Sequence, residues 1–143
     1  MERKNQLHMI FDACEENVAI ARLTAAAFAS CLDFTLSQID EVKVAVSEAV
    51  SNAVIHAYPK GQGKVELTME EYDSCVVYEI RDWGIGIADI EEARRAEFST
   101  RAERMGLGFA FMESFMDTVA VESVIGQGTS VRMVKSCSTL AVQ

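Results

Sequence analysis

The sequence predicts one α+β domain that extends over all 143 residues. Apolar residues recur at helical spacing from Asp40 to His56, as in an amphipathic helix. The segments 64–71 and 75–81 alternate with the period of two that is typical of strands. A second strand pair, 119–122 with 129–134, follows near the C-terminus around a glycine-rich turn. A chain of this length fits a single hydrophobic core.

Composition and charge restrict the classes of partner. Thirteen basic and 22 acidic residues give a net charge of -9, which disfavours binding to nucleic acid. No apolar run reaches the roughly 20 residues that cross a bilayer, and the N-terminus carries no export signal. We therefore expect a cytoplasmic protein without membrane contact. The four cysteines lie far apart and include no CxxC pair, which predicts mostly buried thiols rather than a zinc site or disulfide framework.

The first third of the chain predicts a strand at 6–11 and an alanine-rich helix at 15–31. The expected apolar face of this helix consists of Val18, Ala21, Ala25 and Phe28. Arg22 lies in this apolar surrounding and has two interpretations. Its side chain could extend to solvent from the edge of the core, or it could anchor a protein partner. The sequence leaves both open.

Three polar residues of the central helix, Glu48, Asn52 and His56, are four positions apart and share one helix face. A carboxylate one turn from a carboxamide suits a site with a proton acceptor beside a hard metal ion. The alternative is a solvated helix face, which is where most charged helical residues lie.

The ends of this helix also have sequence signals. Thr35 or Ser37 is expected to cap its N-terminus, with the acidic residues at 40–41 in its first turn. The Tyr58-Pro59 pair is expected to end it, because proline disfavours helical geometry in the preceding residue.

An Asp-x-Gly-x-Gly sequence, Asp82 to Gly86, ends the second predicted strand of the first hairpin. It places a carboxylate where the chain leaves the sheet, and its glycines allow the backbone to approach a ligand closely. An ordinary turn is the alternative.

The polar and basic segment 94–105 is predicted to be a mobile loop, with a solvated connection as the alternative. Its candidate phosphate ligands are Ser99, Thr100 and Arg101. The Gly106-Leu107-Gly108 sequence is predicted to open a helix that continues through Met116. The free N–H groups and positive dipole end of such a helix suit phosphate.

The order of these motifs resembles that of the GHKL nucleotide-binding family, which includes histidine kinases, gyrase, Hsp90 and MutL. The resemblance implies a two-layer sandwich in which helices cover one face of a mixed, mostly antiparallel sheet, and it implies an ATP site with Mg²⁺. It makes Asn52 the metal ligand, Asp82 the residue that binds the adenine amino group, and Thr129 a neighbour of the adenine. The other implied nucleotide-binding residues are Gly84, Gly86, Gly106, Leu107 and Gly108.

Longer segments are similar to the small bacterial anti-sigma factors of the sporulation (sigma F) type that are also serine protein kinases. These segments are ARLTAAAF, VSEAVSNAVIHAY, IRDWGIGIADIEEAR, GLGF and ESFMDTVAVES. The resemblance implies a homodimer that binds a sigma factor and phosphorylates a serine of an anti-anti-sigma protein. It makes Glu48 the general base and Arg22 a contact for both partners. Arg101 stands where a lysine is expected, and Val18 stands where an acidic residue is expected.

Two alternatives stay open at this point. One is the related anti-sigma kinase of the general stress response. The other is a binding module that uses the nucleotide only as a switch and catalyses nothing. A sensor histidine kinase is disfavoured, because the sequence shows no dimerisation domain with a phosphoacceptor histidine on a preceding helix.

Overall fold

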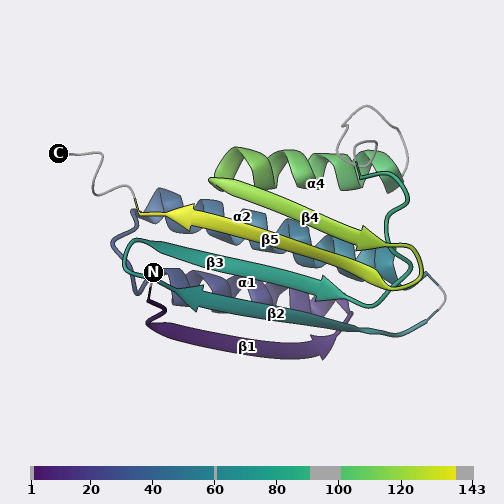
Figure 1. The fold of residues 1–143 in the computed structure, drawn as a ribbon, viewed down its shortest axis with the longest axis horizontal. Coiled ribbons are helices and arrows are strands. Elements are labelled where there is room, and N and C mark those ends of the chain that lie inside the picture. Colours follow the sequence, from purple (N-terminus) through teal and green to yellow (C-terminus); the bar gives the residue numbers. More distant parts are fainter. Residues whose placement is uncertain (1, 60, 91–100, 138–143) are drawn as a thin grey trace.

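The computed structural model describes residues 2–59, 61–90 and 101–137. These residues form a two-layer α+β sandwich, as the sequence predicts (Figure 1). The elements are β1 (Asn5–Asp12), α1 (Glu15–Ala29), α2 (Leu36–Asn52), a π-helical turn η1 (Ala53–Ala57), β2 (Lys64–Glu71), β3 (Cys75–Asp82), α4 (Arg101–Phe115), β4 (Thr118–Val124) and β5 (Gly128–Ser136).

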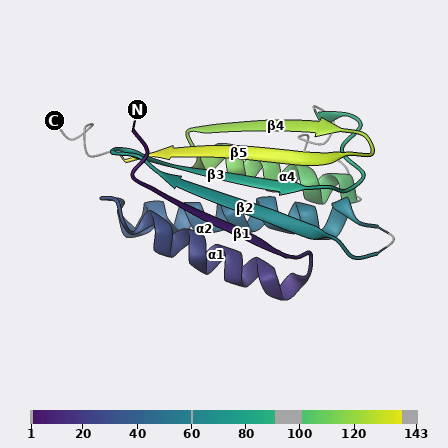
Figure 2. The same cartoon turned by 60° about the horizontal axis from the view of Figure 1, so that its bottom comes forward.

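The five strands form one sheet in the order β1-β2-β3-β5-β4. Every neighbouring pair is antiparallel. The described sheet is therefore purely antiparallel and not mixed. Figure 2 shows α1, α2 and α4 on the same face of this sheet, with α2 in contact with both other helices. No helix in the described ranges is both long and apolar enough to span a bilayer.

The hydrophobic core lies between the helices and the covered face of the sheet. Its largest fully buried side chains come from both layers: Val65, Leu67, Met69, Val76, Tyr78 and Met133 from strands, and Val42, Val46, Val50, Phe109 and Met112 from helices. The alternation predicted for 64–71 is confirmed, since Val65, Leu67 and Met69 are all buried. Of the thiols, Cys75 and Cys137 are buried, Cys14 is half-buried and Cys31 is exposed.

Helix α2 begins at a capping box. The Thr35 hydroxyl accepts a hydrogen bond from Gln38 N (3.1 Å), and Gln38 Oε1 accepts one from Thr35 N (2.9 Å), which confirms Thr35 as the cap. The helix therefore starts at Leu36, and the prediction that the acidic residues at 40–41 lie in its first turn is wrong. They lie one turn further along, because the cap and not the acidic pair determines the first residue.

The C-terminal end of α2 changes its hydrogen-bonding pattern. Its α-helical part ends at Asn52 and continues as the π-helical turn η1 through Ala57. The helical conformation then ends before Pro59, as predicted. Single π-helical turns occur often at functional sites.

Helix α4 begins at Arg101 and not at Gly106. The predicted start is therefore wrong, and so is the predicted loop for residues 101–105, which are helical. Arginine, alanine, glutamate and methionine are strong helix formers, and their intrinsic propensity here outweighs the loss of apolar periodicity. The rest of the predicted loop, 94–100, lies outside the described residues.

Candidate functional site

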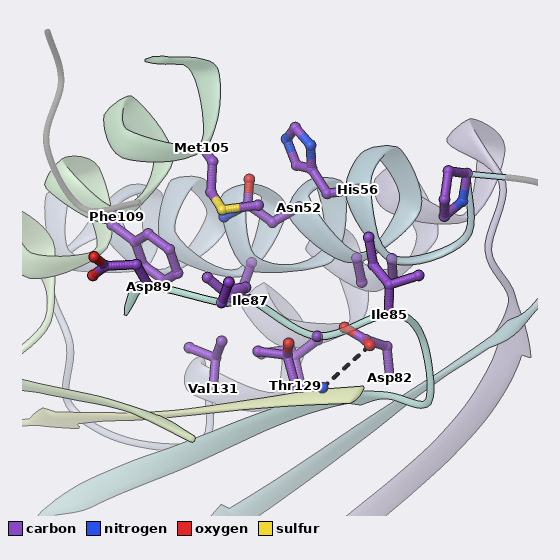
Figure 3. Close-up of a pocket in the computed structure, with 17 residues that line it drawn as sticks. Asn52, His56, Asp82, Ile85, Ile87, Asp89, Met105, Phe109, Thr129 and Val131 are labelled. Carbon is purple, nitrogen blue, oxygen red and sulfur yellow. Dashed lines mark hydrogen bonds between the residues drawn. The ribbon is translucent and has the colours of Figure 1, made fainter. Parts of the chain in front are cut away.

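A cavity of about 450 Å³ lies between the end of α2, the sheet and α4 (Figure 3). Apolar side chains make up much of its wall: Ile80, Ile85, Ile87, Met105, Phe109 and Val131. Asn52 and His56 lie on one side of it, and Asp82 and Thr129 lie on the opposite side. A mostly apolar cavity of this size with a few polar groups is typical of a small-molecule site.

Asp82 is the buried acid of this cavity, with 7% of its surface exposed. It is the last residue of β3, and its Oδ1 accepts hydrogen bonds from Gly84 N (2.9 Å) and Thr129 N (3.2 Å). Burial raises the pKa of its carboxyl group, and the two hydrogen bonds oppose that rise. Both backbone N–H groups donate to Oδ1, so the chain orients the carboxylate. The other oxygen, Oδ2, accepts neither of these two bonds.

The glycines after Asp82 allow the loop to pack closely against its neighbours. A β-carbon at Gly84 would lie 2.2 Å from the carbonyl oxygen of Ala57. Gly86 has a φ of +79°, which favours glycine, and a β-carbon there would lie 2.5 Å from Val124 O. Gly86 lines the cavity, whereas Gly84 does not. The glycines thus let the loop pack closely against backbone on both sides, and their close approach to a ligand stays a prediction.

Ser123 on β4 joins the loop to the β4–β5 hairpin. Its Oγ accepts a hydrogen bond from Ile87 N (2.7 Å) and lies 2.9 Å from Thr129 Oγ1. It also donates to the carbonyl oxygen of Gly128 (3.2 Å). Nothing in the sequence singled out Ser123, because its contacts depend on the pairing of β4 with β5 opposite Thr129.

Glu48 and Asn52 converge on Gly108 where α2 contacts α4. A β-carbon at Gly108 would lie 3.1 Å from Glu48 Oε1, 3.3 Å from Asn52 Nδ2 and 3.4 Å from Asn52 Oδ1. The predicted common face of Glu48 and Asn52 is therefore confirmed. His56 lines the same cavity as Asn52, although η1 alters the helical spacing between them.

Asn52 is half-buried, and its side-chain Nδ2 is buried without a hydrogen-bond partner within the described ranges. Buried polar groups are nearly always hydrogen-bonded, so such an atom in a cavity suggests a site for a ligand. No cluster of three or more His, Cys, Asp or Glu side chains in the described part of the chain could hold a metal ion. Mg²⁺ needs no such cluster, because it keeps several waters and binds substrate phosphates with one or two protein oxygens. The asparagine fits that role.

The remaining predicted residues lie elsewhere. Gly106 is buried inside α4, and Leu107 is 46% exposed on the same helix. Ser99 and Thr100 lie outside the described residues, as does the side chain of Arg101, the first residue of α4. Arg22 is half-buried on α1, which contributes no residue to the cavity. Since α4 includes residues 101–105, the N–H of Gly106 lies beyond the first four described residues of this helix and does not belong to a helix start at Gly106.

Comparison with known proteins assigns this arrangement to a family. Residues 11–135 match the sequence model of the histidine kinase-like ATPase domain. The chain belongs to the histidine kinase-like ATPase family. This membership agrees with the sandwich fold and with the position of the cavity between sheet and helices.

Several similar members of the histidine kinase-like ATPase family are anti-sigma F factors. That of Bacillus subtilis (strain 168) is 44% identical over 138 residues, which cover 94% of each chain. That of Geobacillus stearothermophilus is 46% identical over 138 residues, which cover 93% of each chain. The similarity extends over nearly the whole length of this chain and of each relative, so it includes every described element of the cavity.

Solved structures support the same fold. The crystal structure of the RsbU and RsbW domains of a Mycobacterium tuberculosis protein matches with a TM-score of 0.62 and 19% identity, covering 93% of this chain and 32% of that one. The mycobacterial sensor histidine kinase MprB matches with a TM-score of 0.55 and 17% identity, covering 90% of this chain and 97% of that one. At these identities the likeness concerns the fold alone.

Proposed function

We propose that this histidine kinase-like ATPase domain is an anti-sigma factor of the sigma F type with protein serine kinase activity. In this proposal it binds and inhibits a sigma factor, and it uses ATP with Mg²⁺ to phosphorylate a serine of an anti-anti-sigma protein. The anti-sigma F factors that match it over nearly their full length support the assignment. The convergence of Glu48 and Asn52 on Gly108 is the observation that carries the catalytic part.

Glu48 is proposed as the general base. Phosphoryl transfer asks a protein mainly to position the reacting groups and to neutralise developing charge. Glu48 lies one helical turn from Asn52, and its carboxylate faces α4 at Gly108. A carboxylate in that position can accept the proton of an incoming serine hydroxyl group while the phosphates lie beside Asn52.

Asn52 is proposed as the protein ligand of Mg²⁺, through its side-chain oxygen. Its position in the wall of the cavity supports this role, because Mg²⁺ prefers oxygen ligands such as a side-chain carbonyl. When bound, Mg²⁺ neutralises negative charge on the phosphate oxygens. Gly108 lets α4 approach both side chains closely, since a β-carbon there would lie 3.1 Å from Glu48 Oε1 and 3.3 Å from Asn52 Nδ2.

Asp82 is proposed to bind the adenine amino group. Its Oδ1 is held by Gly84 N and Thr129 N, so the carboxylate has a defined orientation before the nucleotide enters. Apolar residues such as Ile80 and Val131 offer a surface for the ring, and Thr129 lies beside it. Gly86 completes this wall, whereas Gly84 acts through the loop that it allows to pack.

Contacts with the phosphates and with proteins complete the proposal. Ser99, Thr100, Arg101, Gly106 and Leu107 remain predicted phosphate or lid residues on the strength of the motif order. Arg22 remains the predicted contact for both protein partners, and its half-buried position on α1 outside the cavity is compatible with that role. The active form is proposed to be a homodimer.

Calorimetry with ATP, in the presence and absence of Mg²⁺, tests the nucleotide part of the proposal. The wild type should bind ATP, and binding should tighten with Mg²⁺. Asn52→Ala should lose the Mg²⁺-dependent gain, whereas Asn5→Ala, a change on the exposed strand β1, should keep it. Equal Mg²⁺ dependence in Asn52→Ala and the wild type would refute the metal role.

Transfer of label from γ-labelled ATP to a co-purified anti-anti-sigma protein tests the kinase part, and capture of a sigma factor tests the regulatory part. We expect phosphoserine on the partner and ATP-dependent retention of the sigma factor. ATP binding without label transfer would contradict the kinase and favour a nucleotide-switched binding module. Capture of a general-stress sigma factor would favour the related stress-response kinase.

A further inference from the structure

We propose that Tyr58 is a positioning residue for the loop that carries Asp82. Its hydroxyl group lies between β2 and β3, ends their pairing and directs residues 83–86 toward the end of η1. The inference rests on the proposed function, because it assigns Tyr58 a part in binding the base of the nucleotide.

The hydroxyl group of Tyr58 replaces one rung of the sheet. The last pair in the register of β2 with β3 is Val65 opposite Asp82, so Lys64 opposite Trp83 would come next. Tyr58 Oη instead accepts a hydrogen bond from Trp83 N (2.8 Å) and donates one to Lys64 O (2.6 Å). In a continued antiparallel ladder these two backbone groups would bond to each other. The phenol oxygen therefore keeps the two strands apart where the loop begins.

The backbone around this point is arranged for such an insertion. Successive carbonyl groups of a strand point to opposite sides, and Gly63 O accepts a hydrogen bond from Ala13 N (2.9 Å) on the β1 side. The carbonyl of Lys64 therefore points to the β3 side, where Tyr58 meets it. A β-carbon at Gly63 would lie 2.3 Å from Cε1 of the Tyr58 ring. Glycine at this position gives the ring its space.

After β3 the chain turns toward η1, the helical turn that directly precedes Tyr58. Ile85 N donates to the carbonyl oxygen of Ala57 (2.9 Å), and Gly84 passes that carbonyl at a distance that excludes a side chain. The same stretch of chain holds the acid, since Gly84 N donates to Asp82 Oδ1. Tyr58 thus acts on Asp82 indirectly, through the path of the backbone from Trp83 to Gly84.

The expected effect is confined to the base end of the cavity. Glu48 and Asn52 lie on the preceding turns of α2 and face Gly108 on α4, not the loop. Without the hydroxyl group, Lys64 and Trp83 can form the direct rung, which would draw the chain away from Ala57 and disturb the orientation of Asp82. Nucleotide affinity should therefore change, and phosphoryl transfer from bound ATP should not.

The test compares Tyr58→Phe with the matched control Tyr72→Phe. Tyr72 lies in the turn that connects β2 to β3, at the far end of the hairpin from Tyr58. Its hydroxyl group donates to Glu70 Oε1 (3.3 Å). For Tyr58→Phe we expect ATP binding weakened about tenfold by calorimetry, as for a lost hydrogen bond to the backbone. The rate of transfer at saturating ATP should be unchanged. Gly63→Ala, which displaces the ring and keeps the hydroxyl group, should weaken binding as well.

A second readout needs no nucleotide. Trp83 is the single tryptophan of the chain, and its backbone N–H donates to the hydroxyl group of Tyr58. The fluorescence emission of nucleotide-free Tyr58→Phe should differ from that of the wild type, and that of Tyr72→Phe should not. If the wild type bound no ATP, the proposed function would be wrong. The fluorescence comparison would still show whether Tyr58 positions the loop.

Three results would overturn the assignment. The first is an unchanged ATP affinity and unchanged emission in Tyr58→Phe. The second is an equal loss of affinity in Tyr72→Phe, which would show a general effect on the hairpin. The third is a parallel fall in affinity and in the transfer rate at saturating ATP, which would place the effect of Tyr58 on the whole cavity.

Discussion

Gly108 on α4 faces Glu48 on α2 so closely that a β-carbon at position 108 would lie 3.1 Å from Glu48 Oε1. Gly108→Ala should therefore move the Glu48 and Asn52 side chains by a few tenths of an ångström and slow phosphoryl transfer about tenfold or more. Stability should not fall, because alanine is favoured over glycine inside a helix by about 1 kcal/mol. Transfer assays and thermal unfolding measure the two effects.

The control for this change is Gly61→Ala, since a β-carbon at Gly61 meets no atom within 4 Å. It should leave both the transfer rate and the unfolding temperature close to those of the wild type. A Gly108→Ala protein with wild-type transfer would show that the approach of α4 to Glu48 has no part in the reaction.

Glu48→Gln separates binding from chemistry. Glutamine keeps the size of the side chain but cannot accept the serine proton, so transfer should fall about 10²–10⁴-fold, the usual contribution of a general base. ATP affinity should be retained, because the amide still fits beside Gly108. Calorimetry and label transfer measure the two quantities. Glu122→Gln on the exposed part of β4 is the control, and equal transfer rates in the two variants would remove Glu48 from the mechanism.

Asp82→Asn should stabilise the folded protein and at the same time weaken ATP binding. Burial raises the pKa of Asp82 above 3.8, so the folded state binds its proton more tightly than the unfolded state. The free energy of unfolding therefore declines as the pH rises from 3.8 through the raised pKa, and the cost of the buried charge is complete where Asp82 is ionised. Asparagine keeps an oxygen for Gly84 N and Thr129 N and removes that charge.

We accordingly expect Asp82→Asn to unfold at a higher temperature than the wild type at pH 7, with a difference that shrinks as the pH approaches 3.8. ATP binding should weaken, because an asparagine oxygen is a weaker acceptor than a carboxylate. Thermal scans across this pH range and calorimetry at pH 7 check both. A lower unfolding temperature at pH 7 would show that ionised Asp82 stabilises the loop.

We expect Lys135 to stabilise the C-terminal end of α4 with its buried side chain. Its side chain on β5 is 8% exposed, its Nζ donates to the carbonyl oxygen of Phe115, and it lies 3.1 Å from Glu41 Oε1. Lys135→Met would leave a buried helix carbonyl without a partner and should cost about 2 kcal/mol of the free energy of unfolding. Glu41→Gln, at the more exposed partner, should cost less than about 1 kcal/mol. Urea denaturation measures both, and equal losses would mean that the ion pair outweighs the helix cap.

Prediction from sequence worked where a residue's role depends on its near neighbours along the chain. Thr35 is one of the two caps that the sequence predicts, and its partner Gln38 is only three residues away. It fails at Gly106, where the glycine signal predicts a helix start although the preceding residues form helix strongly. Intrinsic propensity and packing against α2 decided that case.

The residues that no sequence pattern identifies have partners far along the chain. Ser123 binds Ile87 N, 36 positions away, and lies beside Thr129 only because of the β4–β5 register. Lys135 meets Glu41 across 94 positions and Phe115 across 20. No local pattern can carry such information, since each contact exists only after strands have paired and helices have packed on them.

The amino-acid sequence alone determined the succession of strands and helices, the shared face of Glu48 and Asn52, and the end of β3 at Asp82, because the periods of two and 3.6 residues are local properties of the backbone. Only the tertiary structure decided that Gly108 faces this acid and amide, and that Tyr58 enters the space between two strands. Those relationships depend on the distance between packed elements, which is set by contacts among side chains distant in sequence.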